Sequence, residues 1–168
     1  MKRLTMGSLF DGIGGFPLAA LEYEIEPIWA SEIERFPMLV TKLHFPRMQH
    51  VGDITKLNGA ALPPVDIICG GSPCQDLSVA GARAGLAGKR SGLFLEQTRI
   101  TKEMRYADIL RGRTGIDVRP RWFLWENVPY ALQHINDVLE RNAEGRRLPD
   151  RSGGDIPNLF RFHISSST

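Results

Sequence analysis

Short apolar runs alternate with helix-like segments along residues 1–145 of this chain. Strand-like runs occur at 4–10, 25–31, 50–54, 65–69 and 121–125. Between and after them, apolar residues recur at helical spacing, which predicts helices at 16–23, 35–45, 93–110 and 130–144. Alternating strands and helices predict an α/β fold, a parallel sheet with helices on both faces. We expect one domain over 1–145 and an irregular tail over 146–168, where the periodicity fails.

Two of the expected helices have apolar residues at regular spacing. In the segment 35–45 these residues are Phe36, Leu39, Val40 and Leu43, three and four positions apart. In the segment 93–110 they include Phe94, Ile100 and Met104. Such spacing is typical of amphipathic helices.

The composition is that of an ordinary globular protein, with 42% hydrophobic and 24% charged residues in 168 positions. No apolar run approaches the roughly 18 residues that a membrane span requires, and the N-terminus lacks a signal-peptide pattern, so we expect a cytoplasmic protein. The net charge of +2 does not by itself indicate a nucleic-acid partner, although basic residues become denser from Arg83 to Arg121. Two cysteines, Cys69 and Cys74, provide neither a disulfide framework nor zinc-ligand spacing, and we expect no metal.

A glycine-rich turn, Asp11–Gly15, lies between the first expected strand and the first expected helix. Glycines let a backbone approach a ligand closely, and the helix that follows has unpaired N–H groups at its start. The alternative is that any tight strand-to-helix turn uses glycine. Pro17 stands where a dinucleotide fingerprint has its third glycine, so the turn does not match that motif.

Two carboxylates follow the next two expected strands. Glu32 can accept hydrogen bonds from ribose hydroxyls, or it can stabilise the start of the next helix. Asp53 is a turn former or an acceptor for the amino group of a base.

The segment Gly70–Gln75 (GGSPCQ) ends the fourth expected strand and places Cys74 on a loop. An isolated cysteine is most often a small buried hydrophobe, but a polar glycine-rich loop favours a reactive thiolate. The loop continues to Gly92 and is basic, so it either holds a phosphate backbone or is a solvated loop. Glu32, Asp53, Cys74 and Glu126 all follow strands, and parallel strands end at one edge, where ligands bind.

At these positions the chain resembles the DNA (cytosine-5-)-methyltransferases. The resemblance is carried by Ser8–Gly15, Gly52–Ile54, Gly70–Gln75 and Glu126–Val128, in the family's order and over about four-fifths of the chain. It implies a Rossmann-like S-adenosylmethionine-dependent methyltransferase sheet, with double-stranded DNA as substrate.

The resemblance also implies a role for individual residues. The implied S-adenosylmethionine site consists of Phe10, Asp11, Gly12, Gly14 and Gly15, with Glu32 on the ribose and Asp53 and Ile54 around the adenine. The implied catalytic set is the nucleophile Cys74, Glu126 on the cytosine ring nitrogen and amine, and Pro73 and Asn127, which orient these two. Gln75, Ser78 and Arg90 would lie on a loop that closes over DNA.

The implied chemistry accounts for these residue types. Carbon 5 of cytosine is a poor nucleophile until a thiolate adds to carbon 6. A carboxyl at Glu126 would donate a proton towards the ring, which requires a raised pKa of the kind that burial supplies. The base must also leave the duplex, at a cost of a few kcal/mol.

The family continues with an arginine-rich strand, a target-recognition region and a last helix, none of which is recognisable in 145–168. We therefore expect a sheet truncated on its C-terminal side, with the fifth strand at an edge. One interpretation is an active methyltransferase of a restriction-modification or phage system, completed by a second chain. The alternative is an inactive remnant that binds S-adenosylmethionine or a partner chain. Another kind of cysteine enzyme would need a histidine base, and we expect none of the four histidines, His44, His50, His134 and His163, to lie at a strand end where it could pair with Cys74.

Overall fold

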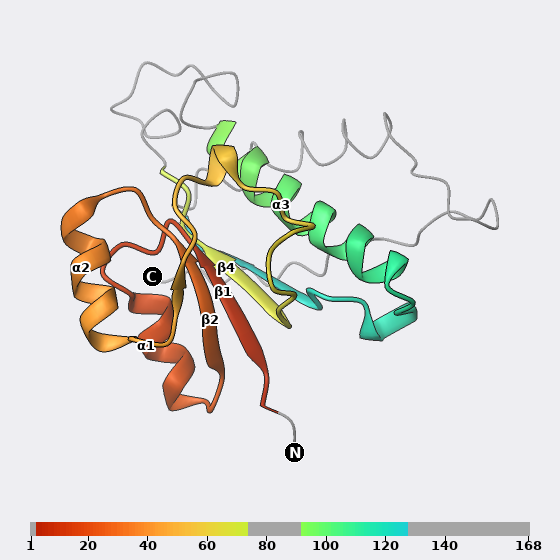
Figure 1. Cartoon of the computed structure of the whole chain (residues 1–168), viewed down its shortest axis with the longest axis horizontal. Coiled ribbons are helices and arrows are strands. Elements are labelled where there is room, and N and C mark those ends of the chain that lie inside the picture. The colour runs from red at the N-terminus through yellow and green to blue at the C-terminus, as the bar shows by residue number, and fades with distance from the viewer. Residues whose placement is uncertain (1–2, 74–91, 128–168) are drawn as a thin grey trace.

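The computed structural model describes residues 3–73 and 92–127 (Figure 1). These residues form a five-stranded sheet of order β3-β2-β1-β4-β5 in which all neighbouring strands are parallel. The strands are β1 (Thr5–Leu9), β2 (Glu26–Ser31), β3 (Gln49–His50), β4 (Ile67–Gly70) and β5 (Trp122–Trp125). The predicted α/β fold is confirmed.

Helices cover both faces of the sheet (Figure 1). They are α1 (Gly15–Glu22), α2 (Arg35–His44) and α3 (Gly92–Leu110). On the α1 side, Met6 and Cys69 pack with Ala20. On the α3 side lies the larger core, in which Trp29, Ile68 and Phe123 pack with Phe94, Ile100 and Met104, so the apolar positions predicted for α3 are buried as expected.

The contact between β1 and β2 depends on a glycine at position 7. A Cβ at Gly7 would lie 2.1 Å from the Trp29 ring, so only glycine leaves room for this indole. The Trp29 Nε1 in turn donates to the carbonyl of Pro63 at 3.0 Å. This pairing fixes the loop ahead of β4 against the sheet.

The expected strand at 50–54 is wrong beyond its first residue. β3 ends at His50, and the chain then turns at Gly52, whose φ is +82°. Asp53 follows as the N-cap of a short 3₁₀ helix, η1 (Ile54–Lys56). The left-handed glycine and the capping carboxylate end the strand, although the apolar pattern alone would continue it.

The predicted helix α2 is confirmed, but three of its four predicted apolar residues do not face the core, and the fourth, Val40, is partly buried. Among the described residues, Phe36, Leu39 and Leu43 are 72%, 65% and 79% exposed, whereas Thr41 is fully buried. Leu18 of the neighbouring α1 is 61% exposed. The two helices therefore present an apolar surface, which we define as Leu18, Leu21, Phe36, Leu39 and Leu43.

Two further predictions concern the C-terminal part. The polar connection 111–120 is confirmed as a loop with one 3₁₀ turn, η3 (Gly115–Asp117). The expected helix 130–144 and the tail 146–168 lie outside the described residues. Within the described ranges, no helix has both the length and the apolar character that crossing a membrane would require.

Candidate functional site

The carboxyl ends of four strands meet at one edge of the sheet. In the register, Leu9 lies beside Ser31 on one side and Gly70 on the other, and Gly70 lies beside Trp125. The next residues continue this alignment, because Asp11 N donates to Ser31 O at 3.1 Å and Glu126 N donates to Gly70 O at 3.1 Å. The segments after β1, β2, β4 and β5 therefore start side by side, as the sequence predicts.

The glycine turn after β1 is tightly folded. Phe10, Gly12 and Gly14 have positive φ angles of +53°, +56° and +90°. Phe10 is one of two non-glycine residues with a positive φ among the described residues. A Cβ at Gly14 would lie 2.8 Å from the Phe45 ring, whereas a Cβ at Gly12 or Gly15 would meet no atom of the described residues within 4 Å. Gly14 is thus required by packing, while Gly12 and Gly15 border open space.

Asp11 is a buried acid at this turn. It is 5% exposed, and neither carboxylate oxygen has a hydrogen-bond partner among the described residues. Burial raises the pKa of Asp11 to about 6, the negative charge of Glu32 adds to the rise, and the nearby Ser8 hydroxyl opposes it. An unpaired buried acid can accept hydrogen bonds from a ligand, and the ammonium group of S-adenosylmethionine is a donor of that kind.

Glu32 joins the turns after β1 and β2. Its Oε2 accepts from Gly12 N at 2.8 Å, and its Oε1 accepts from Ile33 N at 2.7 Å and from Glu34 N at 2.9 Å. The backbone contacts just ahead of α2 agree with the helix-start alternative. A carboxylate has about four acceptor positions, so these bonds leave capacity for a ribose hydroxyl.

Asp53 and Ile54 lie beyond β3, next to the same edge. Asp53 Oδ1 accepts from Thr55 N at 3.0 Å and from Thr55 Oγ1 at 2.8 Å, and these bonds hold the pKa of Asp53 below its ordinary value. Ser31 Oγ donates to Gly52 O at 2.6 Å, which connects this loop to β2. Asp53 is therefore a turn former in the structure, and Ile54 is buried beside it.

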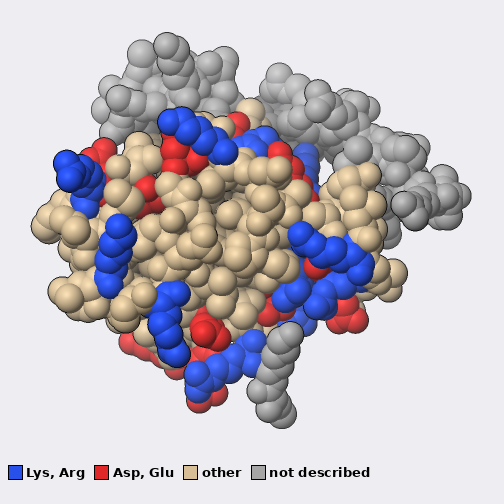
Figure 2. Space-filling model, in the orientation of Figure 1, with Lys and Arg blue, Asp and Glu red and all other residues tan. Residues whose placement is uncertain are grey.

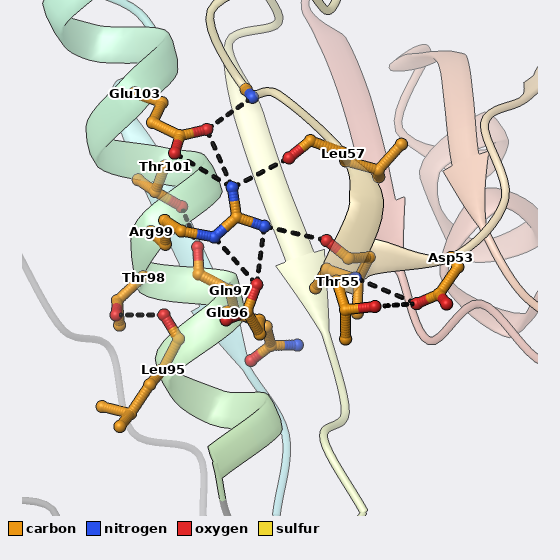
Figure 3. Close-up of polar contacts among 12 residues, drawn as sticks. Asp53, Thr55, Leu57, Leu95, Glu96, Gln97, Thr98, Arg99, Thr101 and Glu103 are labelled. Atoms are coloured by element: carbon orange, nitrogen blue, oxygen red, sulfur yellow. Dashed lines mark hydrogen bonds and ion pairs between the residues drawn. The ribbon is translucent and has the colours of Figure 1, made fainter.

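Arg99 of α3 holds the loop that contains Asp53 (Figure 3). Its guanidinium donates to the carbonyls of Ile54 and Leu57 at 2.9 and 2.8 Å. Glu96 and Glu103 pair with it at 2.6 and 2.9 Å. Sequence analysis missed Arg99: the Glu-x-x-Arg-x-x-x-Glu spacing would have predicted the ion pairs on one helix face, but no sequence signal marks the two carbonyl contacts.

The segments after β4 and β5 are tied together by hydrogen bonds. Ser72 Oγ accepts from Trp125 Nε1 at 3.0 Å, and Ser72 O accepts from Asn127 Nδ2 at 2.8 Å. A Cβ at Gly71 would lie 2.8 Å from Glu126 Oε2, so the Glu126 carboxylate lies directly against this backbone. Pro73, Glu126 and Asn127 are therefore brought together by Ser72, a residue for which the sequence analysis gave no role.

Glu126 differs from expectation in one respect: its side chain is exposed among the described residues, whereas the sequence analysis expected burial beside an apolar strand. The strand is only partly covered, because Leu124 is 43% exposed.

The remaining predicted residues, Cys74, Gln75, Ser78 and Arg90, lie outside the described residues. The other cysteine, Cys69, is 1% exposed, and burial raises the pKa of its thiol to about 12. Cys69 is thus unsuited to act as a nucleophile at neutral pH. No group of three or more His, Cys, Asp or Glu side chains suited to a metal ion occurs in the described ranges.

Comparison with known proteins identifies the family. The family model for C-5 cytosine-specific DNA methylase matches residues 4–143. The chain is 38% identical over 133 residues to the type II methyltransferase M1.ScrFI of Lactococcus lactis subsp. cremoris, covering 79% of this chain and 30% of that protein. It is 33% identical over 161 residues to the DNA N-6-adenine-methyltransferase of Escherichia phage P1, covering 94% of this chain and 20% of that protein.

The chain is also similar to a solved structure of a DNA methyltransferase. A prophage-encoded E. coli protein described as a DNA modification methyltransferase aligns with a TM-score of 0.60 and 27% identity, over 83% of this chain and 36% of that one. The chain spans about a fifth to two-fifths of the length of the curated relatives it matches. The family match, the parallel sheet and the grouped strand ends agree, and the chain belongs to the C-5 cytosine-specific DNA methylase family.

Proposed function

We propose that this chain provides the catalytic side of a DNA cytosine-5 methyltransferase, which transfers a methyl group from S-adenosylmethionine to carbon 5 of cytosine through Cys74. The observation that carries the proposal is the pair of hydrogen bonds from Trp125 and Asn127 to Ser72. They hold the residues just before Cys74 against the strand end that bears Glu126. These contacts support the proposal because they keep Ser72, two residues before Cys74, next to the segment of Glu126, at the edge where the turn after β1 begins.

The turn after β1 fits S-adenosylmethionine, which supplies an electrophilic methyl group when bound. Gly12 and Gly15 border open space, so a ligand can approach their backbone closely. Asp11 offers a buried carboxylate with unused acceptor capacity. We assign Phe10, Gly14 and Glu32 to the same site, and Asp53 and Ile54 to the adenine side of it.

In the proposed reaction, the Cys74 thiolate forms a bond to carbon 6 of cytosine, and the electrons of the 5,6 double bond move towards carbon 5 and the ring nitrogen. Glu126 stabilises this adduct by protonating or hydrogen-bonding that nitrogen. Carbon 5 would then take the methyl group, with the electron pair of the broken carbon–sulfur bond left on the sulfur of S-adenosylmethionine, which Phe10, Gly14 and Glu32 would help to hold. Removal of the carbon 5 proton by a base expels the thiolate and restores the double bond.

DNA binding and completion of the enzyme belong to the same proposal. Gln75, Ser78 and Arg90 contact double-stranded DNA around the flipped cytosine. The rest of the methyltransferase fold, on a second chain or further along this one, covers the apolar surface of α1 and α2. Two observations support this: Leu18, Phe36, Leu39 and Leu43 are more than 60% exposed, and the relatives are more than twice as long as the matched segment. Relatives named from phages and type II systems favour a restriction-modification or phage role.

Two other functions compete with this one. The name of the phage P1 relative points to the amino group of adenine, but this chain covers only 20% of that protein. An exocyclic amine can also attack a methyl group directly, so adenine methylation would leave Cys74 and its loop without a role. The second alternative is an inactive remnant that at most binds S-adenosylmethionine or a partner chain.

The test uses duplex DNA with 5-fluorocytosine in varied sequence contexts, incubated with the full chain and S-adenosylmethionine. Fluorine blocks loss of the group at carbon 5, so the adduct between protein and DNA should persist and shift the protein on a denaturing gel. We expect the adduct with wild type and with Cys69→Ala, and none with Cys74→Ser. An adduct that survives Cys74→Ser would refute the assigned nucleophile. N6-methyladenine in the recovered DNA would favour the adenine function, and cofactor binding by calorimetry without any adduct would favour the remnant.

A further inference from the structure

A polar pocket lies at the edge of the sheet opposite the candidate site, where the strands begin. Its volume is about 160 Å³. The residues that line it come from the segments ahead of β1, β4 and β5: Arg3, Leu4, Asp66, Arg113, Asp117, Arg119 and Arg121. Figure 2 shows Lys and Arg side chains gathered at the lower right, over the region where α3 leads into β5. Strands of four or five residues, at roughly 3.3 Å per residue, place this pocket about 15 Å from the candidate methyl-transfer site.

Positive charge exceeds negative charge in this pocket. Four arginines and two aspartates line it. The buried Asp108 lies behind them, 3.3 Å from Arg113 Nε and 3.8 Å from Arg119 Nε. Even when Asp108 is included, four guanidinium groups face three carboxylates.

The carboxylates are already engaged in holding the fold. Asp66 Oδ2 accepts from Thr5 N and Thr5 Oγ1, both at 3.0 Å, and its Oδ1 pairs with Arg121 at 3.0 Å. Asp108 Oδ2 accepts from Arg119 N at 2.8 Å. These carboxylates have limited capacity to satisfy the guanidinium groups around them.

Arg119 is the guanidinium of this pocket whose Nε is both buried and without a hydrogen-bond partner among the described residues. Its side chain is 15% exposed. Its one ion pair in those residues, with Asp108, is long at 3.8 Å. A buried donor without a partner is costly, so the pocket is suited to a ligand that brings acceptors.

We propose that this pocket binds a phosphate group. A phosphate presents several acceptor oxygens and negative charge, which match the planar donor forks of arginine. Among the described residues Leu4 is the one apolar residue in the lining, so the pocket provides little apolar surface for an acyl chain. The group comes either from free phosphate or from the backbone of bound DNA.

The first test measures thermal unfolding of the full chain in about 10 mM sodium phosphate against sodium chloride at equal ionic strength. We expect phosphate to raise the melting temperature by roughly 2–4 °C, as a ligand specific for the native state does. Arg119→Gln and the milder Arg3→Gln, at an exposed residue, should each remove most of this increase. Arg35→Gln, an exposed arginine of α2 outside the pocket, is the matched control and should keep it.

The second test identifies the source of the phosphate from the salt dependence of duplex DNA binding. If the pocket holds a DNA phosphate, Arg3→Gln should lower the slope of log affinity against log salt by roughly 1. If it holds free phosphate, that slope should stay as in wild type while the thermal increase is lost. An equal increase in wild type, Arg3→Gln and Arg119→Gln, or no increase in wild type, would overturn the proposal, and neither result depends on the methyl-transfer assignment.

Discussion

Asp11 is a residue whose burial should cost stability, and it belongs to the cofactor site proposed above. Its pKa is raised to about 6 from 3.8 because the carboxylate is buried. Between these two values the native state binds more protons than the unfolded chain, so the free energy of unfolding falls as pH rises. Above pH 6 the charged, unpaired carboxylate destabilises the chain by about 1–3 kcal/mol.

Asp11→Asn should therefore stabilise the isolated chain at pH 7.5 and weaken its binding of S-adenosylmethionine. Thermal unfolding from pH 4 to 8 should show the gain at high pH and its disappearance as pH falls towards 4. Glu22→Gln, an exposed acid in α1, is the control and should change neither property. A variant less stable than wild type at pH 7.5 would mean that the carboxylate has a partner in the native state.

Substitutions at Gly14 and Gly15 should distinguish the role of glycine in packing from its role in letting a ligand approach the backbone. Gly14→Ala puts a Cβ 2.8 Å from the Phe45 ring at a φ of +90°, so we expect a loss of about 1–3 kcal/mol of stability. A Cβ at Gly15 meets no atom within 4 Å in the part of the chain that the structure describes, so Gly15→Ala should keep or slightly raise stability. Because a cofactor would approach this open backbone, Gly15→Ala should still weaken S-adenosylmethionine binding.

Denaturant unfolding and titration calorimetry on the two variants check this pair of expectations. We expect only Gly14→Ala to lose stability, and we expect both variants to bind S-adenosylmethionine more weakly. Unchanged binding in Gly15→Ala would place the cofactor elsewhere on the edge.

At the scale of elements, Arg99 connects α3 to the loop that contains Asp53 and Ile54. Arg99→Ala removes two backbone contacts and leaves Glu96 and Glu103 facing each other, so we expect a loss of about 1–3 kcal/mol. Arg99→Lys should recover only part of it, because an ammonium lacks the planar fork that reaches both carbonyls.

Hydrogen exchange provides the local measurement for this clamp. Protection of the amides at 54–57 should fall in Arg99→Ala more than in Lys102→Ala, an exposed residue of the same helix. S-adenosylmethionine binding should weaken in parallel if this loop contacts the adenine. Equal protection in the two variants would show that the loop is held by other contacts.

The elements also show what the sequence could predict. Strand ends at Leu9, Ser31, Gly70 and Trp125 were within a residue of prediction, because apolar runs there stop at glycine or charged residues. The strand predicted at 50–54 extends too far, because the left-handed φ at Gly52 cannot be recognised from the spacing of apolar residues. Asn127 was predicted by resemblance, whereas Ser72 and Arg99 were not, because long-range hydrogen bonds to backbone atoms have no local pattern.

The orientation of α2 was not predictable from its own sequence. The spacing of Phe36, Leu39 and Leu43 identifies a helix, but an apolar stripe can face the core of its own domain or another surface. The structure turns Thr41 inward, where its Cγ2 would lie 2.9 Å from a Cβ at Gly14. Packing against the glycine turn therefore fixes the rotation of this helix, and the stripe faces outward.

At the scale of the whole molecule, this exposed apolar surface predicts behaviour in solution. Exposed apolar side chains that gather on one surface mark interaction sites or cause self-association. Leu39→Ser combined with Leu43→Ser should leave the melting temperature nearly unchanged, because both side chains are largely exposed, and should reduce self-association in sedimentation experiments. A large loss of stability would mean that these leucines are covered within the chain itself.

Asp66, just before β4, contacts Thr5 of β1 and Arg121, the residue before β5, at the edge of the sheet where the strands begin. Hydrogen bonds from Thr5 and the charge of Arg121 outweigh the effect of burial and lower the pKa of this carboxyl. The resulting stabilisation is present above about pH 4 and is lost as pH falls through the depressed native pKa. The two carboxylate oxygens of Asp66 accept from Thr5 and Arg121, and an asparagine at this position has only one acceptor oxygen. Asp66→Asn should therefore lower the free energy of unfolding by about 1–3 kcal/mol near neutral pH.

The same variant should act in the opposite direction on the proposed phosphate pocket. Removing the carboxylate charge releases Arg121 and raises the net positive charge of the pocket, so phosphate should increase the melting temperature more in Asp66→Asn than in wild type. Glu26→Gln, an exposed acid at the start of β2, is the control for a general effect of charge. Lower stability without phosphate together with a larger increase on adding it would show that one carboxylate both fastens the strands and limits anion binding. A smaller increase would mean that Asp66 positions Arg121 for the anion rather than competing with it.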